Sequence, residues 1–419
     1  MELLDAVRSH VLALPSLAKF AIAIAVIVGI PAVARRGRIP EMVGLLLFGV
    51  ILGPHVLDIF GENRPIANFF AELGKLLLMF SAGLEIDIAL FRKAQTRSII
   101  FGLGTTLAPL LLGTLYGLAF GYDIIPAIVI GSLLASHTLL GLSILTRLGA
   151  ARLEPVIVTI GATVVSDTLS LIVFAICVST YTTGFSPMGL LVQVLEIIVF
   201  VPLILIGLSR AGAFVLSRFQ NNEEAFFVTM LGIMALAGLL ADMINLLGIV
   251  GAFLAGLAVN DAVQEHPTRA KLEFFGKALF IPSFFIVTGF LIAPVAFARS
   301  FIADFPLIGG IVLTLLVGKG IAAEVVGRAF GYSRAARLTV WALTLPQVAA
   351  TLAATLVGYD TVNAAGQRML DGRMLNTVLA LLVVTAILGP VLTERFTPGM
   401  LKEGTGPKAA PDYGKPQAG

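Results

Sequence analysis

The sequence predicts an all-α membrane protein of about thirteen transmembrane helices, arranged as two inverted repeats of six helices with one broken helix in each repeat. Three observations support this prediction: the composition, a series of long apolar windows, and the placement of basic residues between them. Of the 419 residues, 58% are hydrophobic and only 13% are charged, whereas soluble domains carry roughly a quarter charged residues. The expected surroundings of the chain are therefore a lipid bilayer.

Apolar windows long enough to cross the hydrocarbon follow one another along the chain. A helix of about twenty apolar residues spans a bilayer, and we see no short alternating strands of the kind that build a membrane barrel. The predicted spans 1 to 13 are residues 17–34, 41–58, 68–90, 98–120, 124–147, 154–179, 187–207, 223–243, 246–260, 275–297, 306–328, 338–358 and 372–391.

Basic residues fall mainly in alternate loops. Most of the 28 lysines and arginines lie in the loop after span 1, in every second loop from there, and in the C-terminal tail. Because loops rich in Lys and Arg stay on the cytoplasmic side, we expect a cytoplasmic C-terminus and an external N-terminus in the cell (inner) membrane. Residues 402–419 form a low-complexity run of Gly, Pro, Lys and Ala, and residues 396–419 are predicted as a disordered cytoplasmic tail.

An internal repeat relates the two halves of the chain. The segment Val43–Gly49 in span 2 resembles Val250–Gly256 in span 9, at an offset of 207 residues. Gly83 in span 3 matches Gly289 in span 10, at an offset of 206 residues. Seven crossings separate equivalent spans, so the second repeat is expected upside down relative to the first. Inverted repeats of this kind are typical of secondary transporters.

Spans 5 and 12 are each interrupted by polar residues near the middle of the membrane, at a similar offset. The interruptions are Ser136-His137-Thr138 and Thr344-Leu345-Pro346-Gln347. A broken helix frees backbone carbonyls and presents helix ends that can hold an ion. The alternative is that Pro346 only kinks its helix while residues 136–138 pack against a neighbour.

One carboxylate, Asp167, lies in the middle of the otherwise apolar span 6. A charge at that depth costs at least a few kcal/mol, which favours a functional role. Thr163 lies one turn earlier on the same helix face, so the two side chains offer hard oxygens to a desolvated monovalent cation, with carbonyls of the span 5 break completing the shell. The same oxygens hold either a proton or a cation. The alternative is a structural Asp bonded to neighbouring hydroxyls.

Other charged or polar side chains at depth have less specific roles. Lys319 in span 11 is the natural counter-charge for Asp167, or else part of a permanent structural salt bridge. Glu324, five residues further on, is expected to form a structural ion pair with Arg328, one turn away. His137 could sense pH, or simply support the break by packing and hydrogen bonding.

The motifs of several other classes of protein are absent from the sequence. The four histidines do not form a His-Glu-x-x-His zinc motif, and no phosphate-binding Gly-x-x-x-x-Gly-Lys-Ser/Thr loop occurs. The loops are too short to fold as a nucleotide-binding domain, and the single cysteine, Cys177, excludes an internal disulfide. We therefore expect neither an enzyme nor an ATP-driven pump, no cofactor, and no nucleic-acid partner.

Five segments follow one another in a characteristic order: Glu41–Pro54, Glu72–Glu85, the Ser136–Thr138 break, the Asp167 helix and the pair Gly318-Lys319. Together they resemble the monovalent cation:proton antiporter superfamily, in particular its Kef-type and bacterial Na⁺/H⁺ exchanger branch. The resemblance covers about residues 17–395, which would form one transmembrane antiporter unit.

The resemblance implies a homodimer with two parts in each protomer. A dimerisation part of about residues 17–90 and 223–297 would be joined by a linker helix, about 187–207, to a core part. The core, about 98–179 and 306–391, would carry the two broken helices, crossed, and would slide to carry Asp167 from one side of the membrane to the other. That movement is an elevator mechanism.

The chain departs from the family pattern at one position of the site. Members of the family typically carry Asp-Asp, Asn-Asp or Gln-Asp where this chain has Ser166-Asp167. In the Asp-Asp members the first acid pairs with the lysine of span 11 and transport tends to be electrogenic. Because Ser166 carries no charge, electroneutral one-for-one exchange is expected here. The Gln-Asp form is associated with K⁺, so the choice between Na⁺ and K⁺ stays open.

The expected function is therefore antiport of Na⁺, or alternatively K⁺ or Li⁺, against H⁺. Asp167 would bind cation and proton in turn, with Thr163, Ser166 and the break from Ser136 to Thr138 assisting. Lys319 would compensate the empty carboxylate, while His137, Pro346 and Gln347 would support the breaks. Two alternatives stay open: a Na⁺-coupled symporter of a small organic anion on a related inverted-repeat fold, and a channel or sensor without coupled exchange.

Overall fold

A computed structural model of the protein describes residues 8, 12–36, 41–85, 94–184, 186–244, 246–264, 266–295, 297 and 303–403. Regular structure within these residues is helical, apart from one isolated β-bridge between Val362 and Arg368. The end of predicted span 3, residues 86–90, and residues 404–419 of the predicted tail lie outside the described residues.

Within the described part of the chain, nine helices are long and apolar enough to cross a membrane. Seven are continuous: α2 (Ser16–Arg36), α4 (Arg64–Glu85), α6 (Gln95–Ala119), α9 (Glu154–Thr183), α12 (Glu223–Met243), α17 (Phe305–Ala329) and α20 (Gly372–Glu403). Two contain a π-helical segment: α10–η2–α11 (Pro187–Pro202, Leu203–Leu208, Ser209–Arg218) and α14–η3–α15 (Thr268–Phe275, Gly276–Phe280, Ile281–Gly289).

Shorter helices occupy the remaining predicted spans. Spans 2 and 9 are α3 (Glu41–Leu52) and α13 (Gly248–Val263). Spans 5 and 12 each consist of two helices: α7 (Ile124–Ala135) with α8 (Leu142–Arg147), and α18 (Arg334–Leu343) with α19 (Ala349–Asp360). The prediction of an all-α fold with about thirteen spans, two of them broken, is confirmed.

The start of the predicted tail was wrong, because α20 continues to Glu403 despite Pro390 and Pro398 within it. Packing explains the extension. Met400 is fully buried in a cluster with residues such as Ala335 and Leu343, and the Glu403 carboxylate accepts a hydrogen bond from the Ala335 backbone N–H at 3.2 Å. Residues 396–403 are therefore part of the folded protein.

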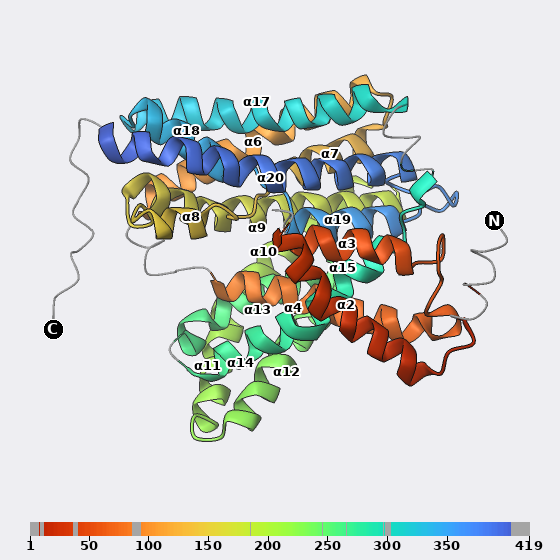
Figure 1. Ribbon diagram of the computed structural model, residues 1–419. Helices are drawn as coiled ribbons and strands as arrows, with labels where there is room; N and C mark the ends of the chain where they lie inside the picture. Colours follow the sequence, from red (N-terminus) through yellow and green to blue (C-terminus); the bar gives the residue numbers. More distant parts are fainter. Residues whose placement is uncertain are drawn as a thin grey trace. The chain divides into compact units, whose positions relative to one another are not determined.

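The chain forms two compact units, each made from both halves of the sequence. Unit 1 comprises residues 1–85 and 191–305, and unit 2 comprises residues 86–190 and 306–419. The boundary at residues 190 and 191 falls inside α10, the first part of the predicted linker. In Figure 1, unit 2 contains the helices coloured orange to yellow from α6 to α9 and cyan to blue from α17 to α20.

In unit 1, α3 and α15 cross where both helices have glycine. A Cβ added to Gly49 of α3 would overlap the carbonyl oxygen of Ile286 in α15. A Cβ added to Gly289 of α15 would overlap the carbonyl oxygen of Leu46 in α3. Because glycine has no Cβ, the two backbones can approach each other this closely.

A second crossing in unit 1 has the same geometry with other glycines. A Cβ on Gly256 of α13 would overlap the carbonyl oxygen of Phe80 in α4, and a Cβ on Gly83 of α4 would overlap the carbonyl oxygen of Phe253 in α13. Each overlapped carbonyl belongs to the residue three positions before the partner glycine, as in the first crossing.

The two crossings are related by the internal repeat. The offset of 207 residues converts the glycine of α3 into that of α13, and the offset of 206 converts the glycine of α4 into that of α15. The α3–α15 crossing therefore corresponds to the α13–α4 crossing with the two repeats exchanged. This exchange is what a pseudo-two-fold axis between inverted repeats produces.

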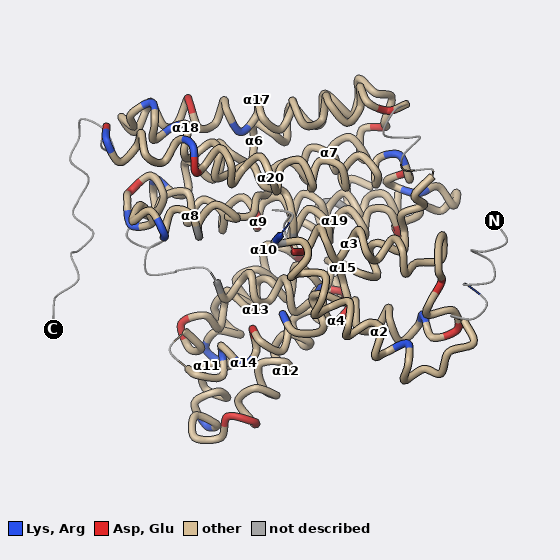
Figure 2. The backbone as a smooth tube through the Cα atoms, viewed as in Figure 1, with Lys and Arg blue, Asp and Glu red and all other residues tan. Residues whose placement is uncertain are grey.

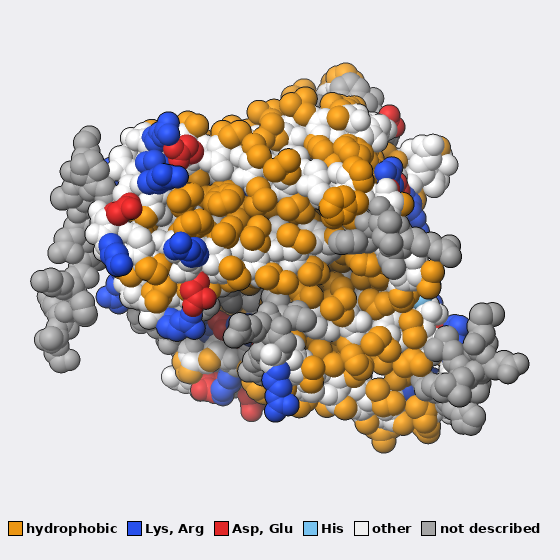
Figure 3. All heavy atoms as spheres, turned by 45° about the horizontal axis from the view of Figure 1, so that its top comes forward, with side chains coloured by type: hydrophobic (Ala, Val, Ile, Leu, Met, Phe, Trp, Pro, Cys, Tyr) orange, Lys and Arg blue, Asp and Glu red, His pale blue; other side chains and the backbone are white. Residues whose placement is uncertain are grey.

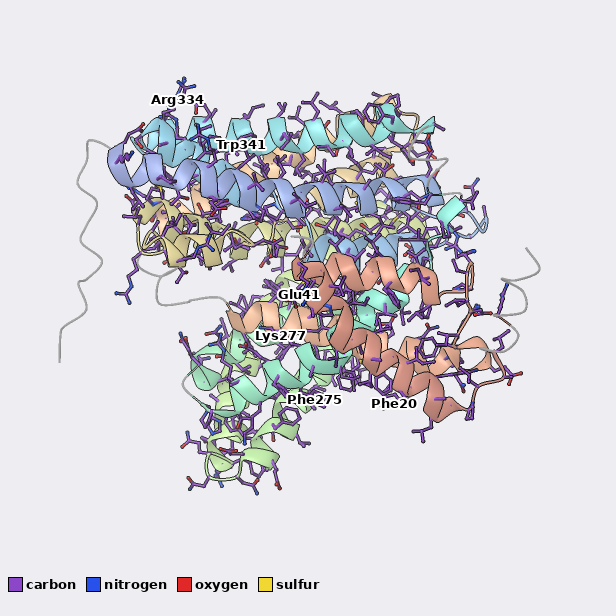
Figure 4. All side chains as sticks on the ribbon, viewed as in Figure 1. Phe20, Glu41, Phe275, Lys277, Arg334 and Trp341 are labelled. Carbon is purple, nitrogen blue, oxygen red and sulfur yellow. The ribbon has the colours of Figure 1, made fainter. Side chains whose placement is uncertain are left out.

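Unit 2 places its broken helices among four long helices. Helix α6 packs along α7 and α9, and α20 packs along α18 and α19. Trp341 of α18, labelled in Figure 4, donates its indole N–H to the carbonyl of Leu316 in α17 at 2.9 Å. Figure 2 shows that charged residues gather mainly toward the helix ends, and Figure 3 shows apolar side chains covering the stretch between the ends. This pattern fits a bilayer-spanning unit.

A buried ionic cluster fixes the start of α9. The Glu154 side chain is 3% exposed, pairs with Arg97 of α6, and accepts a hydrogen bond from the Tyr332 hydroxyl at 3.2 Å. Burial, and after it the Glu154 charge, raises the pKa of the Tyr332 hydroxyl, which therefore stays protonated and donates. Because the start of α9 is held in place, the depth in the membrane of the residues further along this helix is set as well.

The glycine crossings predict a position-specific loss of stability. We expect Gly49→Ala and Gly256→Ala each to lower the free energy of unfolding by about 2 kcal/mol or more, because the added methyl group forces the backbones apart. Thermal unfolding of purified protein in detergent measures the effect.

The matched control for these two variants is Gly232→Ala in α12, where an added Cβ meets nothing within 4 Å. Its stability should stay the same or rise slightly, because alanine favours the helix. Equal melting temperatures for all three variants would contradict the close crossings.

Candidate ion-binding site

The two breaks lie against each other in unit 2 and satisfy each other's backbone groups. The first break runs from Ser136 to Gly141 and the second from Thr344 to Val348. The N–H of Thr138 donates to the carbonyl of Pro346 at 2.8 Å. The side-chain amide of Gln347 donates to the carbonyl of Ser136 at 2.7 Å. The broken helices therefore cross at these residues, as the fold prediction requires.

Gln347 connects the crossing to two further helices. Its amide oxygen accepts from the Thr351 hydroxyl of α19 at 2.6 Å, and its backbone N–H donates to the Thr385 hydroxyl of α20 at 3.1 Å. Gln347 is fully buried. Because an unpaired polar group costs several kcal/mol in hydrocarbon, these contacts make Gln347 a structural support of the break.

Lys319 satisfies two backbone carbonyls that have lost their helical donors. Its ammonium donates to the carbonyl of Thr105 in α6 at 3.0 Å and to the carbonyl of Ala135 at 2.6 Å. Pro109 lacks an N–H, so it leaves the carbonyl of Thr105, four residues earlier, without a donor. Ala135 is the last residue of α7, where the helix breaks. The ammonium also opposes the negative end of the α7 dipole.

The approach of α17 to α6 depends on Gly318. A Cβ on this residue would lie 2.9 Å from the Cα of Pro109, so a larger residue would push the helices apart. Lys319 itself has no exposed surface. Its ammonium forms no ion pair within 4 Å with Asp167 among the described residues, so compensation of that carboxylate by Lys319 stays a prediction.

Asp167 lies on α9 against the first break. Its Oδ1 accepts a hydrogen bond from the backbone N–H of His137 at 3.3 Å. The imidazole of His137, only 2% exposed, lies between two hydroxyls of α9. Its Nε2 is 3.0 Å from the Thr163 hydroxyl, and its Nδ1 is 3.3 Å from the Ser166 hydroxyl.

Each of these hydroxyls also lies 3.1 Å from a carbonyl of its own helix, Thr163 from that of Thr159 and Ser166 from that of Thr163. A neutral imidazole has one N–H and one bare nitrogen, so one hydroxyl accepts from His137 and donates to its own helix, while the other donates to the bare nitrogen. In either tautomer each hydroxyl oxygen keeps at least one lone pair for its surroundings. Lone pairs beside a carboxylate favour a positively charged ligand over an anion.

The structure brings most of the predicted site residues together. Asp167, Thr163, Ser166 and His137 form one group, and Thr138 joins the two breaks through its backbone N–H. The Ser136 hydroxyl instead lies 3.2 Å from the Thr351 hydroxyl. The other predicted pair is separate: Glu324 binds Arg328 at 2.6 Å and also Arg337 at 2.8 Å.

Several residues that shape the site were not singled out from the sequence. Thr351 and Thr385 hold Gln347, and Pro109 frees a carbonyl for Lys319. Pro109 has a recognisable sign in the sequence, because a proline within an apolar span always leaves a carbonyl open four residues earlier. Isolated threonines in apolar helices carry no such sign, since they usually bond to their own backbone.

Residues 22–396 match the family described as sodium/hydrogen exchanger, transmembrane, and the chain belongs to this family of multi-pass membrane proteins. The superfamily resemblance is thereby confirmed. The chain is 44% identical over 379 residues to the Na⁺/H⁺ antiporter NhaS5 of Synechocystis, covering 90% of this chain and 54% of that protein's length. It thus spans about half of that relative.

Two further comparisons cover nearly all of both chains. The chain is 28% identical to the Na⁺/H⁺-K⁺ antiporter GerN of Bacillus cereus, covering 89% of this chain and 92% of GerN. In fold it is similar to the sodium proton antiporter MjNhaP1 of Methanocaldococcus jannaschii, with a TM-score of 0.67, 17% identity, and coverage of 93% and 98% of the two chains. These relatives are named as transporters rather than enzymes, and they do not support the organic-anion symporter.

The bonds of Lys319 predict a non-additive effect on stability. We expect Lys319→Met to cost about 2–4 kcal/mol, because two buried carbonyls lose their donor. In a Pro109→Ala background the same substitution should cost about 1 kcal/mol less, because the introduced alanine would supply the N–H that the Thr105 carbonyl lacks. Thermal unfolding of the four proteins in detergent gives the double-mutant cycle.

Lys277→Met serves as the control, since its side chain is 58% exposed and pairs with Glu273 at 3.3 Å. Its cost should stay below about 1 kcal/mol. An equal cost of Lys319→Met in both backgrounds would show that the Thr105 carbonyl does not depend on Lys319.

Proposed function

We propose that the protein is a secondary antiporter that exchanges a monovalent cation for H⁺, with Asp167 as the shared binding group. The observation that carries the proposal is one ionisable carboxylate held against the crossing of two broken helices by the N–H of His137. The family and the names of the relatives support the class of transport. Na⁺ is the first candidate, and the name of GerN keeps K⁺ under consideration.

Competition at Asp167 would couple the two ions. The carboxylate binds either a proton or a cation, because a protonated oxygen loses the charge that attracts a cation. The Thr163 hydroxyl, one turn before it, offers a neutral oxygen lone pair. Together with Ser166 and carbonyls of the break from Ser136 to Thr138, these groups supply the hard oxygen ligands that alkali ions favour.

We also propose electroneutral exchange of one cation for one proton, and the charges at the site support it. Ser166 offers no second acid, so one negative charge is available to carry either ion. We further propose a homodimer formed by unit 1, with unit 2 as the moving part of an elevator mechanism. In this proposal the C-terminus lies in the cytoplasm and the N-terminus outside the cell membrane, in agreement with the basic loops.

Proton movement in liposomes tests the proposed exchange. Purified protein is reconstituted with an internal pH dye and an imposed pH gradient, and Na⁺, K⁺ or Li⁺ is added in turn. We expect at least one cation to dissipate the gradient with the wild type, and Asp167→Asn to lose more than about 90% of this rate, because an amide cannot exchange a proton. A matched control is Asp360→Asn, since Asp360 is exposed and pairs with Arg368 at 3.8 Å.

A wild type that moves no protons on addition of any of these cations between about pH 6 and 9 would exclude the proposal. Cation flux without opposite proton movement would favour a channel instead.

The stoichiometry has its own test in the same liposomes. The initial rate of Na⁺-driven proton movement is measured with and without a membrane potential imposed by K⁺ and valinomycin. Equal rates are expected for one-for-one exchange, because no net charge crosses. An acceleration of several-fold by one sign of the potential would show electrogenic exchange.

A further inference from the structure

A small cavity in unit 2 lies beside the proposed site, among helices α7, α9 and α19. Hydroxyl groups line it from all three helices: Ser132 and Ser136, Ser170, and Thr351. These four side chains are between 1% and 4% exposed. The rest of the lining is apolar, with Phe174 the largest side chain. Four hydroxyls thus face one space in the interior of unit 2.

The hydroxyls of Ser132 and Ser170 have already donated their hydrogens. Ser132 donates to the carbonyl of Val129 at 2.7 Å, and Ser170 donates to the carbonyl of Asp167 at 3.0 Å. A hydroxyl has one hydrogen and two lone pairs. What these two side chains can still offer to the cavity is therefore a lone pair.

The other two hydroxyls are arranged in a chain with the same result. Thr351 donates to the amide oxygen of Gln347 at 2.6 Å, and this leaves the Ser136 hydroxyl, 3.2 Å away, to donate to Thr351. A rotation of the Thr351 hydroxyl toward the carbonyl of Leu133, 3.3 Å away, would again donate its hydrogen to an oxygen. None of the four hydrogens is left for a ligand.

The cavity leaves about 10 Å³ for the centres of water-sized spheres, which is the space that a single water molecule needs. A space that offers only oxygen lone pairs accepts a cation, or a water molecule that donates both its hydrogens, and disfavours an anion. It contains no carboxylate, so a cation would be held weakly and released easily.

The cavity lies on one side of Asp167 along α9. Ser170 lies one turn beyond Asp167 along α9, and Phe174 lies one further turn beyond Ser170. Ser132 lies one turn before the break in α7, and Thr351 lies four residues after Gln347 at the start of α19. All of these residues lie from Asp167 toward the C-terminal end of α9, which is the external side in the proposed orientation.

We propose that this hydroxyl cage is a second, uncharged binding station for the transported monovalent cation, between Asp167 and the membrane face at the C-terminal end of α9. The inference rests on the proposed antiport. At this station the cation exchanges water ligands for hydroxyl oxygens before it reaches the carboxylate, or after it leaves. The station binds a desolvated alkali cation such as Na⁺ or K⁺.

Transport measured from each face tests the station. Ser132→Ala and Ser170→Ala are made singly and together and assayed in oriented proteoliposomes, with the cation supplied at one face at a time. We expect each substitution to raise the KM for the cation roughly threefold to tenfold at the face of the α9 C-terminus, with little change at the other face. The asymmetry matters, because a general loss of stability would affect both faces.

The matched control is Thr355→Val, which removes a buried hydroxyl from the same helix as Thr351. That hydroxyl donates to the carbonyl of Thr351 at 2.6 Å and does not line the cavity. Its KM should equal that of the wild type at both faces. An unchanged KM at both faces in the Ser132→Ala Ser170→Ala double variant would overturn the station.

A direct view of the ion separates this inference from the proposed function. Crystals soaked with Tl⁺ or Rb⁺ should show anomalous density in the hydroxyl cage, and the peak should persist in Asp167→Asn. Water in the cage gives no anomalous signal, so an empty map there would overturn the station even if antiport is observed. Conversely, a peak in the cage of a protein that shows no antiport would support the second binding station and contradict the proposed exchange.

Discussion

Unit 2 depends on one constraint: polar backbone groups that are freed inside the membrane must find partners within the protein. The two breaks meet this constraint largely by hydrogen bonding to each other, Thr138 to Pro346 and Gln347 to Ser136. Lys319 satisfies the carbonyl at the end of α7 together with the one opened by a proline in α6. The ammonium is thus part of the backbone hydrogen bonding of the unit, whatever it contributes as a positive charge.

The same constraint determines the chemistry that the interior of unit 2 presents. Serines and threonines in a membrane helix bond back to their own carbonyls, as Ser132 and Ser170 do here. Each bond uses the only hydrogen of the hydroxyl and leaves oxygen lone pairs facing outward. A row of such residues makes a surface of acceptors without any formal charge. The Asp167 carboxylate lies beside that surface, so the region as a whole favours positive ligands over anions.

Features that a short stretch of sequence indicates by itself could be predicted, whereas contacts between distant segments could not. Apolar windows revealed the spans, polar interruptions revealed the breaks, and a charge in an apolar stretch marked Asp167. The partners of Lys319 depend on the packing of Gly318 against Pro109, which neither segment shows alone. The end of α20 was missed for a related reason: residues 396–419 are predicted as a disordered tail, but burial of Met400 keeps the chain helical as far as Glu403.

The glycine crossings of unit 1 also show how the two halves of the chain depend on each other. Each of the two crossings described above takes one glycine from each half of the sequence, α3 with α15 and α13 with α4. Neither half contains both members of a crossing, so a protein of half the length could close the same contacts only against a second copy inserted in the opposite direction. The contacts have the geometry of an antiparallel pair of half-length units, which the helix from α10 to α11 joins within one chain as an additional crossing.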